Sequence, residues 1–510
     1  MALFKNIPET KKLTFLITII FSLYSLFPTS NSTIDAYYYA ACIKYDRELF
    51  LPHHLLYNWL GYIIYRPIVM AGILVQPLAM MKIINALYAS GCLLIFYSIL
   101  KKLNYNVHMI LPLVAISGLT FGMWRFATEN ENYIIPIFFS LFASYYFLLY
   151  NNEKKSIHLV ISGTAGAIAC LFHQIHFFWW LALLIGIVLI YKKLKPFLLF
   201  GLPAFIVPFV YLIVMKFYYH LSINIFNIMH FVFQDFYNGQ VDTSIGTKNF
   251  SLTAISFIRT FFQIHGLQII LIKRNFLYAL PVIFVLTLFV WILFKRKNLF
   301  LSAKNKTNKP FILIHLGVFI LQLLFAFYSV GNAEFMVMLP FPFLIVLTYY
   351  MEIKTIALWL FVAVLLVWNL MLGILPNFIY NYWGTEYVIS KVIHNNSAFY
   401  ILNDKPLIEN ILYYKYGNEA TRNITNAPNE YIASKRPLVK LSDTINYLLE
   451  RDEKVFTNCI DKPKIMNRAA FIVSISDNEF FKNYKTEKTD SFDTFFGKYY
   501  FTILRKDTLK

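Results

Sequence analysis

The sequence predicts a polytopic α-helical membrane protein with about eleven transmembrane helices, followed by a small C-terminal α/β domain. Hydrophobic residues make up 58% of the chain and charged residues only 14%, whereas soluble domains carry about 25% charged residues. Apolar runs of about 18 to 25 residues recur between short polar breaks. After residue 375 the pattern changes to short β-like runs that alternate with helical stretches, which is typical of an α/β domain.

Lysines near the ends of the apolar runs predict the orientation. They gather before the first run and in alternate loops, at Lys5, Lys11, Lys12, Lys101, Lys102, Lys154, Lys155, Lys192, Lys193, Lys195, Lys295, Lys297, Lys304, Lys306 and Lys309, together with Arg296. This pattern places these loops and the N-terminus in the cytoplasm, and an odd number of spans then places the C-terminus outside. It also accounts for the net charge of +19 without a nucleic-acid partner, because a basic rim suits anionic lipid.

The first apolar run, Leu13 to Pro28, is interpreted as a retained span because no small-residue cleavage site follows it. The predicted spans cover residues 13–28, 78–100, 107–123, 133–150, 157–172, 176–191, 196–216, 277–294, 310–328, 338–351 and 355–375. Residues 1–375 therefore form the predicted transmembrane, catalytic domain, and residues 376–510 form the external α/β domain.

Two external segments interrupt the spans. Residues 29–77 contain Pro52, Pro67 and Pro77 and are expected to form helices that lie on the membrane surface. Residues 217–276 contain a turn-rich stretch, Asn238 to Lys248, that is suited to a mobile lid or a substrate loop. In the C-terminal domain, strands are expected at 398–402, 470–474 and 499–503, and a helix at 441–450.

Acids and histidines cluster in the breaks that face outward. They are Asp35, His53, His54, Glu129, Glu131, His173 and His176. Charged groups close to a bilayer are costly and usually mark function. The cluster predicts a site where a lipid headgroup meets a water-soluble substrate.

Each of these groups also has an ordinary interpretation. Asp35 is either a general base or part of a helix-capping box with Ser32. If the chain is helical there, Glu129 and Tyr133 share a face that Glu131 does not, so only one glutamate is expected in a common cleft. The adjacent His53 and His54 cannot share a helical face either. His173 and His176, three residues apart, suit a metal, a headgroup or a simple interfacial position.

Several cations lie on the predicted outer side, where the positive-inside pattern disfavours them. A phosphate-bearing ligand would explain them, and so would ordinary loop solubility. They are Arg66, Arg125, Arg259, Lys273 and Arg274. Glu334 adds one more acid at an outer span end.

These residues resemble the motifs of the GT-C superfamily of membrane glycosyltransferases, and in particular bacterial relatives of the protein O-mannosyltransferases. Asp35 matches the acid after the first span, His53 to Tyr57 with Gly61 match a His-Pro-Pro-Gly-type stretch, Glu131 to Tyr133 match Glu-x-Tyr, and His173 or His176 matches a later histidine. The motifs cover residues 10–200, and the remainder is similar in architecture. The Pro-Pro-Gly core is missing, the acid pair is reduced to Asp35 before Ala36, and Asn332 to Phe335 replace an Arg-Tyr-type motif.

The resemblance implies a glycosyltransferase that moves a sugar from a polyprenyl-phosphate-linked donor to an acceptor hydroxyl, with inversion, at the outer face of a bacterial inner membrane. Asp35 would be the base, and Glu131 would support it. Substrate contacts would come from His53, His54, Tyr57, Arg66, Arg125, Glu129, Tyr133, His173, His176 and Glu334. A divalent metal is possible, with Asp35, His54 and His176 as candidate ligands.

Three alternatives remain open. A lipid-linked glycan polymerase or ligase would share most of these features. A transporter or flippase for lipid-linked sugars predicts broken helices and polar groups near the middle of the membrane. A non-catalytic scaffold predicts that Asp35 is dispensable. The sugar and the acceptor (protein, lipid or glycan) are not predicted by the sequence.

Overall fold

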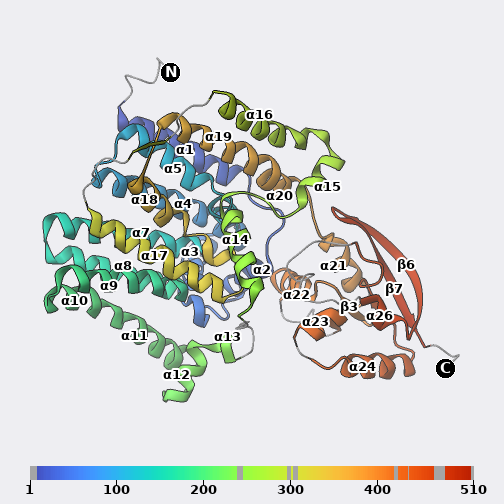
Figure 1. The fold of residues 1–510 in the computed structure, drawn as a ribbon. Helices are drawn as coiled ribbons and strands as arrows, with labels where there is room; N and C mark the ends of the chain where they lie inside the picture. Colours follow the sequence, from blue (N-terminus) through green and yellow to red (C-terminus); the bar gives the residue numbers. More distant parts are fainter. Residues whose placement is uncertain are drawn as a thin grey trace. The chain divides into compact units, whose positions relative to one another are not determined.

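The computed structural model describes residues 8–237, 245–295, 300–302, 308–417, 423–434, 436–463 and 477–506 (Figure 1). The chain divides into two compact units. The first, called the membrane unit here, comprises Met1–Thr29, Glu48–Ile264 and Leu271–Leu375. The second, the C-terminal unit, comprises Ser30–Arg47, His265–Ile270 and Pro376–Lys510. Two short segments that the sequence scheme placed with residues 1–375 therefore cluster with the C-terminal residues.

Helices dominate the first three-quarters of the chain. They are α1 Glu9–Leu26, α2 Ile34–Tyr45, α3 Tyr57–Met70, α4 Pro77–Lys102, α5 Val107–Leu119, α6 Phe121–Ala127, α7 Ile134–Glu153, α8 Ser156–Phe172, α9 Phe177–Tyr191, α10 Leu194–Gly201, α11 Ile206–Ile213, α12 Ile225–Val232, α13 Gln234–Tyr237, α14 Thr247–Phe261, α15 Leu267–Arg274, α16 Leu280–Lys295, α17 Lys309–Tyr328, α18 Pro340–Tyr350, α19 Thr355–Asn369 and α20 Leu375–Ile379. Short 3₁₀ turns at Pro52–His54, Gln174–His176 and Glu334–Met336 join several of them.

Each of the eleven predicted spans contains a helix, but fewer meet the length and composition of a full span. In the part of the chain that the structure describes, six helices are long and apolar enough to cross a membrane: Pro77–Lys102, Ile134–Glu153, Gln174–Tyr191, Leu194–Tyr218, Lys309–Tyr328 and Thr355–Ile379. The pair α5 and α6, bent by 62°, adds a seventh if it is one broken span. Three other apolar helices are shorter. The protein is thus a multi-pass membrane protein, and the count of eleven stays a prediction.

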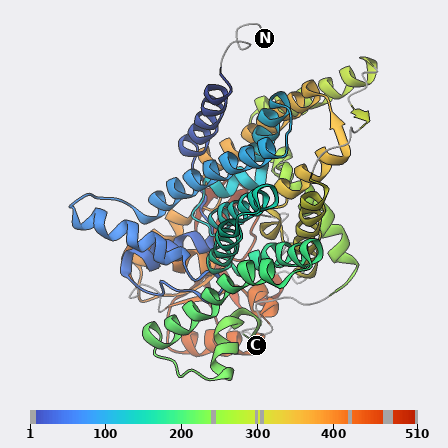
Figure 2. The ribbon, with the colours of Figure 1, turned by 90° about the vertical axis from the view of Figure 1, so that its left-hand side faces the viewer.

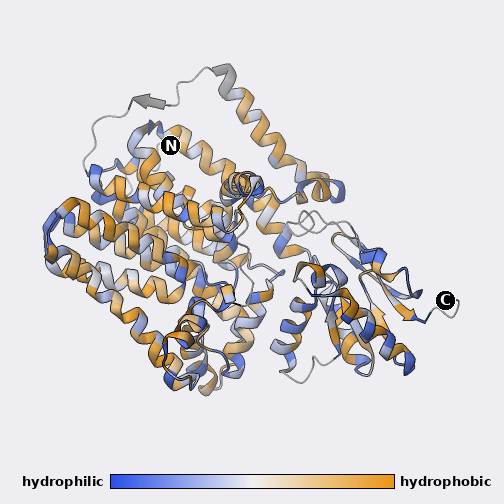
Figure 3. Ribbon diagram, turned by 60° about the horizontal axis from the view of Figure 1, so that its bottom comes forward, coloured by the Kyte–Doolittle hydropathy of each residue, from blue (hydrophilic) through white to orange (hydrophobic). Residues whose placement is uncertain are grey.

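The apolar surface of these helices explains why they need a membrane. Only 17% of the apolar window in Leu194–Tyr218 is buried inside the protein, and Phe205, Phe209 and Phe217 are exposed. Figure 3 shows that hydrophobic residues dominate the helices of the membrane unit. Helices satisfy their own backbone hydrogen bonds, so such surfaces are stable against lipid and would be costly in water.

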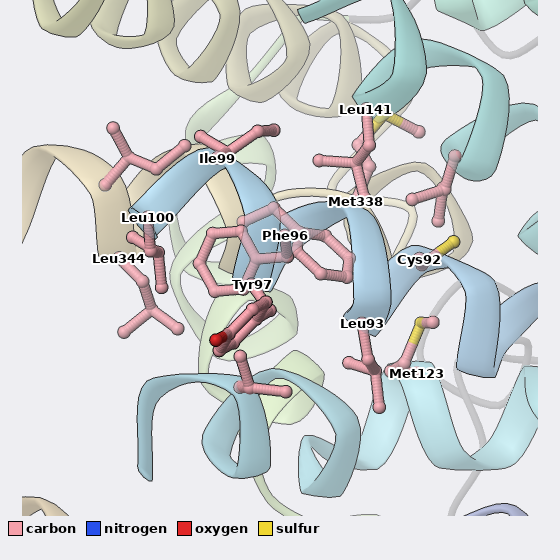
Figure 4. Close-up of a cluster of buried hydrophobic side chains, with 14 of the residues drawn as sticks. Cys92, Leu93, Phe96, Tyr97, Ile99, Leu100, Met123, Leu141, Met338 and Leu344 are labelled. Atoms are coloured by element: carbon pink, nitrogen blue, oxygen red, sulfur yellow. The ribbon is translucent and has the colours of Figure 1, made fainter. Parts of the chain in front are cut away.

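The interior of the membrane unit is packed around α4. Helices α4, α7 and α8 lie side by side (Figures 1 and 2). Figure 4 shows side chains of α4, including Phe96, among residues of neighbouring helices. Phe96 meets Phe341 of α18 edge to face, with ring centroids 5.2 Å apart. This core fixes the positions of α4 and α7. The polar residues of the site lie near the N-terminal ends of these two helices.

The C-terminal unit is built on a five-stranded sheet in the order β4-β3-β5-β7-β6. The strands are β3 Phe399–Leu402, β4 Ile424–Asn426, β5 Val455–Thr457, β6 Lys485–Thr494 and β7 Gly497–Arg505. Strand β3 runs parallel to β4 and β5, and the hairpin β6–β7 is antiparallel to β5. The helices are α21 Thr385–His394, α22 Lys405–Tyr416, α23 Pro428–Ala433, α24 Leu438–Glu450 and α26 Asp477–Phe481. Elsewhere, β1 Phe300–Ser302 pairs with β2 Met351–Ile353.

Residues of the two sheet faces pack against different helices. Tyr400, Phe456 and Phe501 form one core with residues of α21 and α22. Ile401, Val455 and Leu504 form another with residues of α24 and α26. The runs predicted at 398–402 and 499–503 are strands β3 and β7, and the helix expected at 441–450 is α24. The expected strand at 470–474 and residues 238–244 of the turn-rich loop lie outside the described residues.

Candidate functional site

The loop between α6 and α7 is both polar and buried. Glu129, Asn130, Glu131 and Asn132 are each at most 3% exposed. Helix α7 begins only at Ile134, so the expectation that Glu129 and Tyr133 share a helical face, opposite Glu131, is wrong. A buried non-helical loop must find partners for its backbone polar groups.

Asn85 of α4 supplies those partners. Its side-chain amide donates to the backbone carbonyls of Glu129, at 2.7 Å, and of Glu131, at 2.8 Å. It also donates to the Tyr57 hydroxyl at 3.1 Å, and that hydroxyl donates to Asn130 Oδ1 at 2.8 Å. Asn85 thereby fixes the path of the loop and links it to the first turn of α3.

The two glutamates of the loop have different surroundings. Glu129 lies 3.7 Å from Lys82 Nζ and accepts a hydrogen bond from the Asn130 backbone N–H at 2.8 Å. Lys82 is 8% exposed and also donates to the Thr29 carbonyl at 2.7 Å. Glu131 lies in the electrostatic neighbourhood of Tyr57, whose pKa is raised by burial and then by Glu131. Glu129 is thus a partner in an ion pair, and Glu131 is the carboxylate beside a buried phenol.

Tyr133 connects the loop to a distant acid. Its hydroxyl donates to Glu334 Oε2 at 2.9 Å, across 201 positions of sequence. Its ring centroid lies 5.3 Å from that of His173. The structure therefore brings together three predicted site residues from three separate span ends.

The histidines form a second group beside Tyr133. The rings of His53 and His54 lie 4.2 Å apart in the turn Pro52–His54. The backbone N–H of Leu56 donates to the Leu171 carbonyl at 3.1 Å, and the Gln174 amide donates to the Pro52 carbonyl, also at 3.1 Å. These bonds hold the turn that contains His53 and His54 against the turn that contains His173 and His176.

Burial decides the charge of two of these histidines. Burial, and then the neighbouring His53, lower the pKa of both His54 and His173 well below 6.5. Both imidazoles are therefore neutral at neutral pH. They can donate or accept a hydrogen bond to a ligand, but they do not offer it a positive charge.

His176 has one ring nitrogen engaged and one without a partner. Its Nδ1 lies 2.7 Å from Ser140 Oγ, while its buried Nε2 has no hydrogen-bond partner in the described structure. Gln322 of α17 donates to the Ile175 carbonyl at 2.9 Å, and its buried Oε1 also lacks a partner there. Each of these two atoms could take part in a hydrogen bond with a polar group of a ligand or with a water.

Asp35 belongs to the C-terminal unit. It is exposed, in the first turn of α2. Thr33, not Ser32, caps this helix, because Thr33 Oγ1 accepts from the Ala36 N–H at 3.1 Å. The capping box that the sequence allowed for Ser32 and Asp35 therefore does not explain Asp35.

The segment around Asp35 is tied to the C-terminal residues by side-chain hydrogen bonds. The Asn31 amide donates to the carbonyls of Asn377, at 3.0 Å, and Tyr380, at 2.7 Å, and its Oδ1 accepts from the Tyr382 N–H at 2.7 Å. Asn410 of α22 donates to the Ile34 carbonyl at 3.0 Å. Asn31 and the carbonyl of Ile34, the first residue of α2, are thus held by residues far away in the sequence.

The predicted phosphate-binding cations differ in exposure. Arg125 is half-buried, with its guanidinium 5.6 Å from the Phe126 ring centroid. Arg259 is half-buried in α14, whereas Arg66, Lys273 and Arg274 are exposed. Over the described ranges of the chain, no three His, Cys, Asp or Glu side chains are arranged to hold a metal ion. Of the candidate ligands, His54 and His176 belong to the membrane unit and Asp35 to the C-terminal unit, and a metal bound by them stays a prediction.

Four residues of the site were not predicted. Lys82, Asn85, Gln174 and Gln322 are polar residues that lie in or next to apolar runs. Lys82 and Asn85 stand three residues apart, which places them on one side of a helix. That spacing was the available signal for a polar face on α4.

Comparison with known proteins gives a fold but no close relative. No family model and no curated protein sequence matches the chain. The structure is similar to the oligosaccharyltransferase of Archaeoglobus fulgidus in complex with zinc and sulfate, with a TM-score of 0.50, 14% identity, and 96% of this chain and 72% of that chain covered.

The same enzyme tethered to an acceptor peptide that contains the NVT sequon gives a TM-score of 0.50 at 12% identity, covering 98% of this chain and 74% of that chain. ArnT from Cupriavidus metallidurans bound to undecaprenyl phosphate gives a TM-score of 0.49 at 11% identity, covering 97% and 98%. The two oligosaccharyltransferase structures, at a TM-score of 0.50, show a likeness of fold along nearly the whole chain, which agrees with the resemblance stated from the sequence.

Proposed function

We propose that this protein is a GT-C-type glycosyltransferase that moves a sugar from a polyprenyl-phosphate-linked donor to an acceptor hydroxyl. The observation that carries the proposal is the buried Glu129–Tyr133 loop, with Tyr133 hydrogen-bonded to Glu334 and its ring next to that of His173. Such a set of acids, amides and imidazoles is costly in an apolar protein and is expected where a polar substrate binds. The likeness of fold to an oligosaccharyltransferase supports the same proposal.

The proposed reaction is a single displacement. The acceptor oxygen attacks the anomeric carbon, the bond from that carbon to the phosphate oxygen breaks, and the polyprenyl phosphate leaves with the bonding electrons. Asp35 accepts the acceptor's proton, and the configuration inverts. General-base catalysis of this kind contributes about 10² to 10⁴ in rate.

The membrane unit would bind the donor. Glu131 and Tyr57 would accept and donate hydrogen bonds to sugar hydroxyls, and Glu334 would hold Tyr133 in place. The neutral imidazoles of His54 and His173, and the free Nε2 of His176, would hydrogen-bond to the phosphate or the sugar. His53 would add a further contact at the edge of this group.

Charge on the leaving phosphate would be stabilised by a guanidinium. Arg125 is the stronger candidate because it is half-buried, two residues after the buried Met123, whereas Arg66 is exposed. Lys82 is engaged by Glu129 and Thr29 and is better suited to hold the loop. No step is assigned to a metal, because the described residues do not offer a three-ligand set.

A lipid-linked-sugar flippase is the second candidate, and two observations favour it. Helices α5 and α6 form a broken pair bent by 62°, as expected for a transporter. His315 also lies fully buried in the span α17, within 3.0 Å of Ser144 Oγ. A glycan polymerase or ligase would use the same chemistry as the proposed transferase and differ only in its acceptor.

We further propose that the protein lies in a bacterial inner membrane, with its N-terminus in the cytoplasm and the C-terminal α/β unit outside. The lysine pattern of the loops supports this orientation. The donor's sugar would then be used at the outer face, where an acceptor protein, lipid or glycan is available.

The test is a donor panel. Purified full-length protein is incubated with radiolabelled polyprenyl-phosphate sugars and a membrane extract as the source of acceptor, and sugar release and transfer are measured. Cleavage of one donor, with the label in a larger product, is the expected result. Movement of a fluorescent lipid-linked sugar across proteoliposomes, without any donor cleavage, would favour the flippase instead.

A further inference from the structure

The C-terminal unit contains a place where α/β sheets commonly bind ligands. The chain leaves the carboxyl end of β3 through α22 toward β4, whereas β5 lies on the other side of β3 and is followed by the hairpin β6–β7. After β3 the chain goes to one side of the sheet, and after β5 it goes to the other side. The two connections therefore separate between β3 and β5. Ligands of open α/β sheets bind outside the carboxyl ends of the strands at such a switch point.

Polar residues follow each of the three parallel strands at this edge. Asn403 and Asp404 follow β3, Asn429 follows β4 and Asn458 follows β5. The Asn403 backbone N–H donates to Asn458 Oδ1 at 2.9 Å, which joins two of the loops. We call this set, together with Lys462 and Asp477, the sheet-edge cluster.

Lys462 and Asp477 close the cluster. Asp477 is 2% exposed; its Oδ1 accepts from the Asn429 N–H at 2.9 Å, and its Oδ2 accepts from Lys462. Lys462 also donates to Asn403 Oδ1 at 2.5 Å. Within the described residues, side chains thus join the segments that follow β3, β4 and β5.

Some polar atoms at this edge remain unused. Tyr499 of β7 is 4% exposed, and its hydroxyl has no hydrogen-bond partner in the described structure. It interacts electrostatically with Asp404 and Cys459, so it lies at the same edge. The side-chain oxygen of Asn429 is also buried without a partner there. Buried polar atoms without partners are uncommon in folded proteins and call for an explanation.

The net charge of the sheet-edge cluster indicates which class of ligand it favours. Lys462 compensates Asp477, which leaves the carboxyl groups of Asp404 and the exposed Glu430 in excess. Burial raises the pKa of Asp404, and burial and then Asp404 raise the pKa of Glu430. A phosphate or carboxylate would be repelled here, whereas hydroxyl and ammonium groups would be attracted. No metal-binding triad of acids occurs within the described residues, so an organic ligand fits better.

We propose that the sheet-edge cluster binds a sugar unit through its hydroxyl groups and prefers one that carries an amino group. Asp404 would accept from an ammonium or hydroxyl group, Tyr499 would donate to a ring or hydroxyl oxygen, and Asn429 Oδ1 would accept from a further hydroxyl. All residues of this cluster belong to the C-terminal unit, whereas the proposed donor site is made of residues of the membrane unit. The inference does not depend on the proposed transferase activity, because it concerns binding alone.

Three disaccharides with the same β-1,4-linked frame test the proposal. Chitobiose carries two amino groups, N,N′-diacetylchitobiose carries two acetamides and cellobiose carries hydroxyls only. Binding to the full-length protein in detergent is measured calorimetrically at pH 6, where the amines are protonated. Chitobiose is expected to bind in the millimolar range or better, and at least about threefold more tightly than cellobiose.

Two variants and one control locate the binding. Asp404→Asn is expected to weaken chitobiose about tenfold, and Tyr499→Phe to weaken all binding disaccharides about three- to tenfold. Tyr499→Phe removes a hydroxyl that has no partner, so the protein should fold at least as well as wild type. Tyr447→Phe, on the exposed surface of α24, is the control and should bind as wild type does.

Three results would overturn the proposal. One is the absence of binding by all three disaccharides up to about 10 mM. Another is tighter binding of cellobiose than of chitobiose, which would contradict the charge argument. The third is unchanged chitobiose binding in a folded Tyr499→Phe variant and in Asp404→Asn, which would place the sugar elsewhere. A donor-cleavage assay on the same variants shows separately whether the transferase proposal holds.

Discussion

At the residue scale, Asn85 is the side chain on which the buried Glu129–Tyr133 loop depends most. It is fully buried, and one amide group pairs two loop carbonyls and the Tyr57 hydroxyl. A single residue of α4 therefore replaces the hydrogen bonds that a helix would have provided. An apolar residue at this position would remove the Asn85 hydrogen bonds from both carbonyls.

We predict that Asn85→Leu lowers the free energy of unfolding by about 2 to 6 kcal/mol, because each of the two buried carbonyls that loses its Asn85 hydrogen bond costs about 1 to 3 kcal/mol. The measurement is the thermal unfolding of purified protein in detergent. Asn227→Ala on α12 removes bonds made near the surface to Ser222 and serves as the control. An Asn85→Leu protein as stable as this control would contradict the role of Asn85.

The lowered pKa of His54 and His173 gives a prediction for pH. Above pH 6.5 these imidazoles are neutral in both the folded and the unfolded chain, and the full stability is present. As the pH falls below 6.5, the unfolded chain binds protons that the folded protein does not. Proton binding therefore stabilises the unfolded state relative to the folded state. Stability is expected to decline on acidification, by at most about 1.4 kcal/mol per pH unit for each histidine.

The check is the apparent unfolding temperature between pH 7.5 and pH 5.5. His173→Gln should flatten this dependence, whereas His108→Gln, which removes an exposed imidazole at the start of α5, is the comparison. A steeper decline in the His173→Gln protein would contradict the assignment of His173 as a buried neutral group.

The polar residue types of the site were visible in the sequence, but their partners were not. His53, His54, Glu131 and His173 stand out against an apolar background. Asn85 is separated in the sequence by 44 and 46 residues from the two loop residues to which it donates. No local pattern encodes such a contact.

At the element scale, helices α8 and α10 approach each other closely because Gly163 has no side chain. A Cβ atom at Gly163 would lie 2.2 Å from the Phe200 carbonyl oxygen, which is a backbone atom that cannot move alone. Gly201, at the end of α10, has no such neighbour, since the nearest atom would be Leu184 Cδ1 at 4.0 Å. The two glycines therefore differ in function although both lie in apolar helices.

We predict that Gly163→Ala destabilises the protein by about 1 to 3 kcal/mol, because α8 and α10 must separate. Gly201→Ala should be neutral or stabilising by up to about 1 kcal/mol, because alanine favours the helix. Thermal unfolding of both variants in the same detergent makes the comparison. Equal effects of the two substitutions would show that the close approach of α8 to the Phe200 backbone is not needed.

The existence of the helices was predictable because long apolar runs determine them. Each of the eleven predicted ranges contains a helix, whereas the break between α5 and α6 and the short 3₁₀ turns were not predicted. The break lies at Thr120, whose hydroxyl donates to the Ser117 carbonyl at 2.9 Å. Here a side-chain hydroxyl competes with the backbone for a helical carbonyl. Such a local contact leaves the apolar run in the sequence unchanged, so the run did not predict the break.

At the scale of the whole molecule, the C-terminal unit includes the segment that contains Asp35. Asn31 makes three hydrogen bonds with residues 377–382, and Asn410 holds the Ile34 carbonyl. These contacts span more than 340 positions of sequence, so the sequence offered no signal for them. The C-terminal residues are therefore part of what fixes the backbone at Asp35.

We predict that Asn31→Ala lowers kcat by at least about tenfold with little change in the donor KM, because the base loses its fixed position. Hydrogen exchange of residues 34–45 should increase in the same variant. Asn423→Ala, which removes a single bond to the Asn396 carbonyl in the same unit, should change neither. An Asn31→Ala enzyme with wild-type kcat and faster exchange would show that the segment need not be held for catalysis.

The most direct test of the central claim compares two aspartates of the same segment. Asp35 lies in the first turn of α2, and Asp46 lies at its C-terminal cap with a positive φ of 56°. Asparagine accepts this backbone conformation, so Asp46→Asn is a matched control for the loss of one carboxylate. Sugar transfer from the donor found in the panel is measured for both variants, together with their unfolding temperatures.

Asp35→Asn is expected to lose about 10² to 10⁴ in kcat with an unchanged unfolding temperature, while Asp46→Asn retains activity. Equal turnover by Asp35→Asn and wild type would contradict the account and remove Asp35 from the chemistry. Attention would then turn to Glu131 as the carboxylate beside the buried Tyr57.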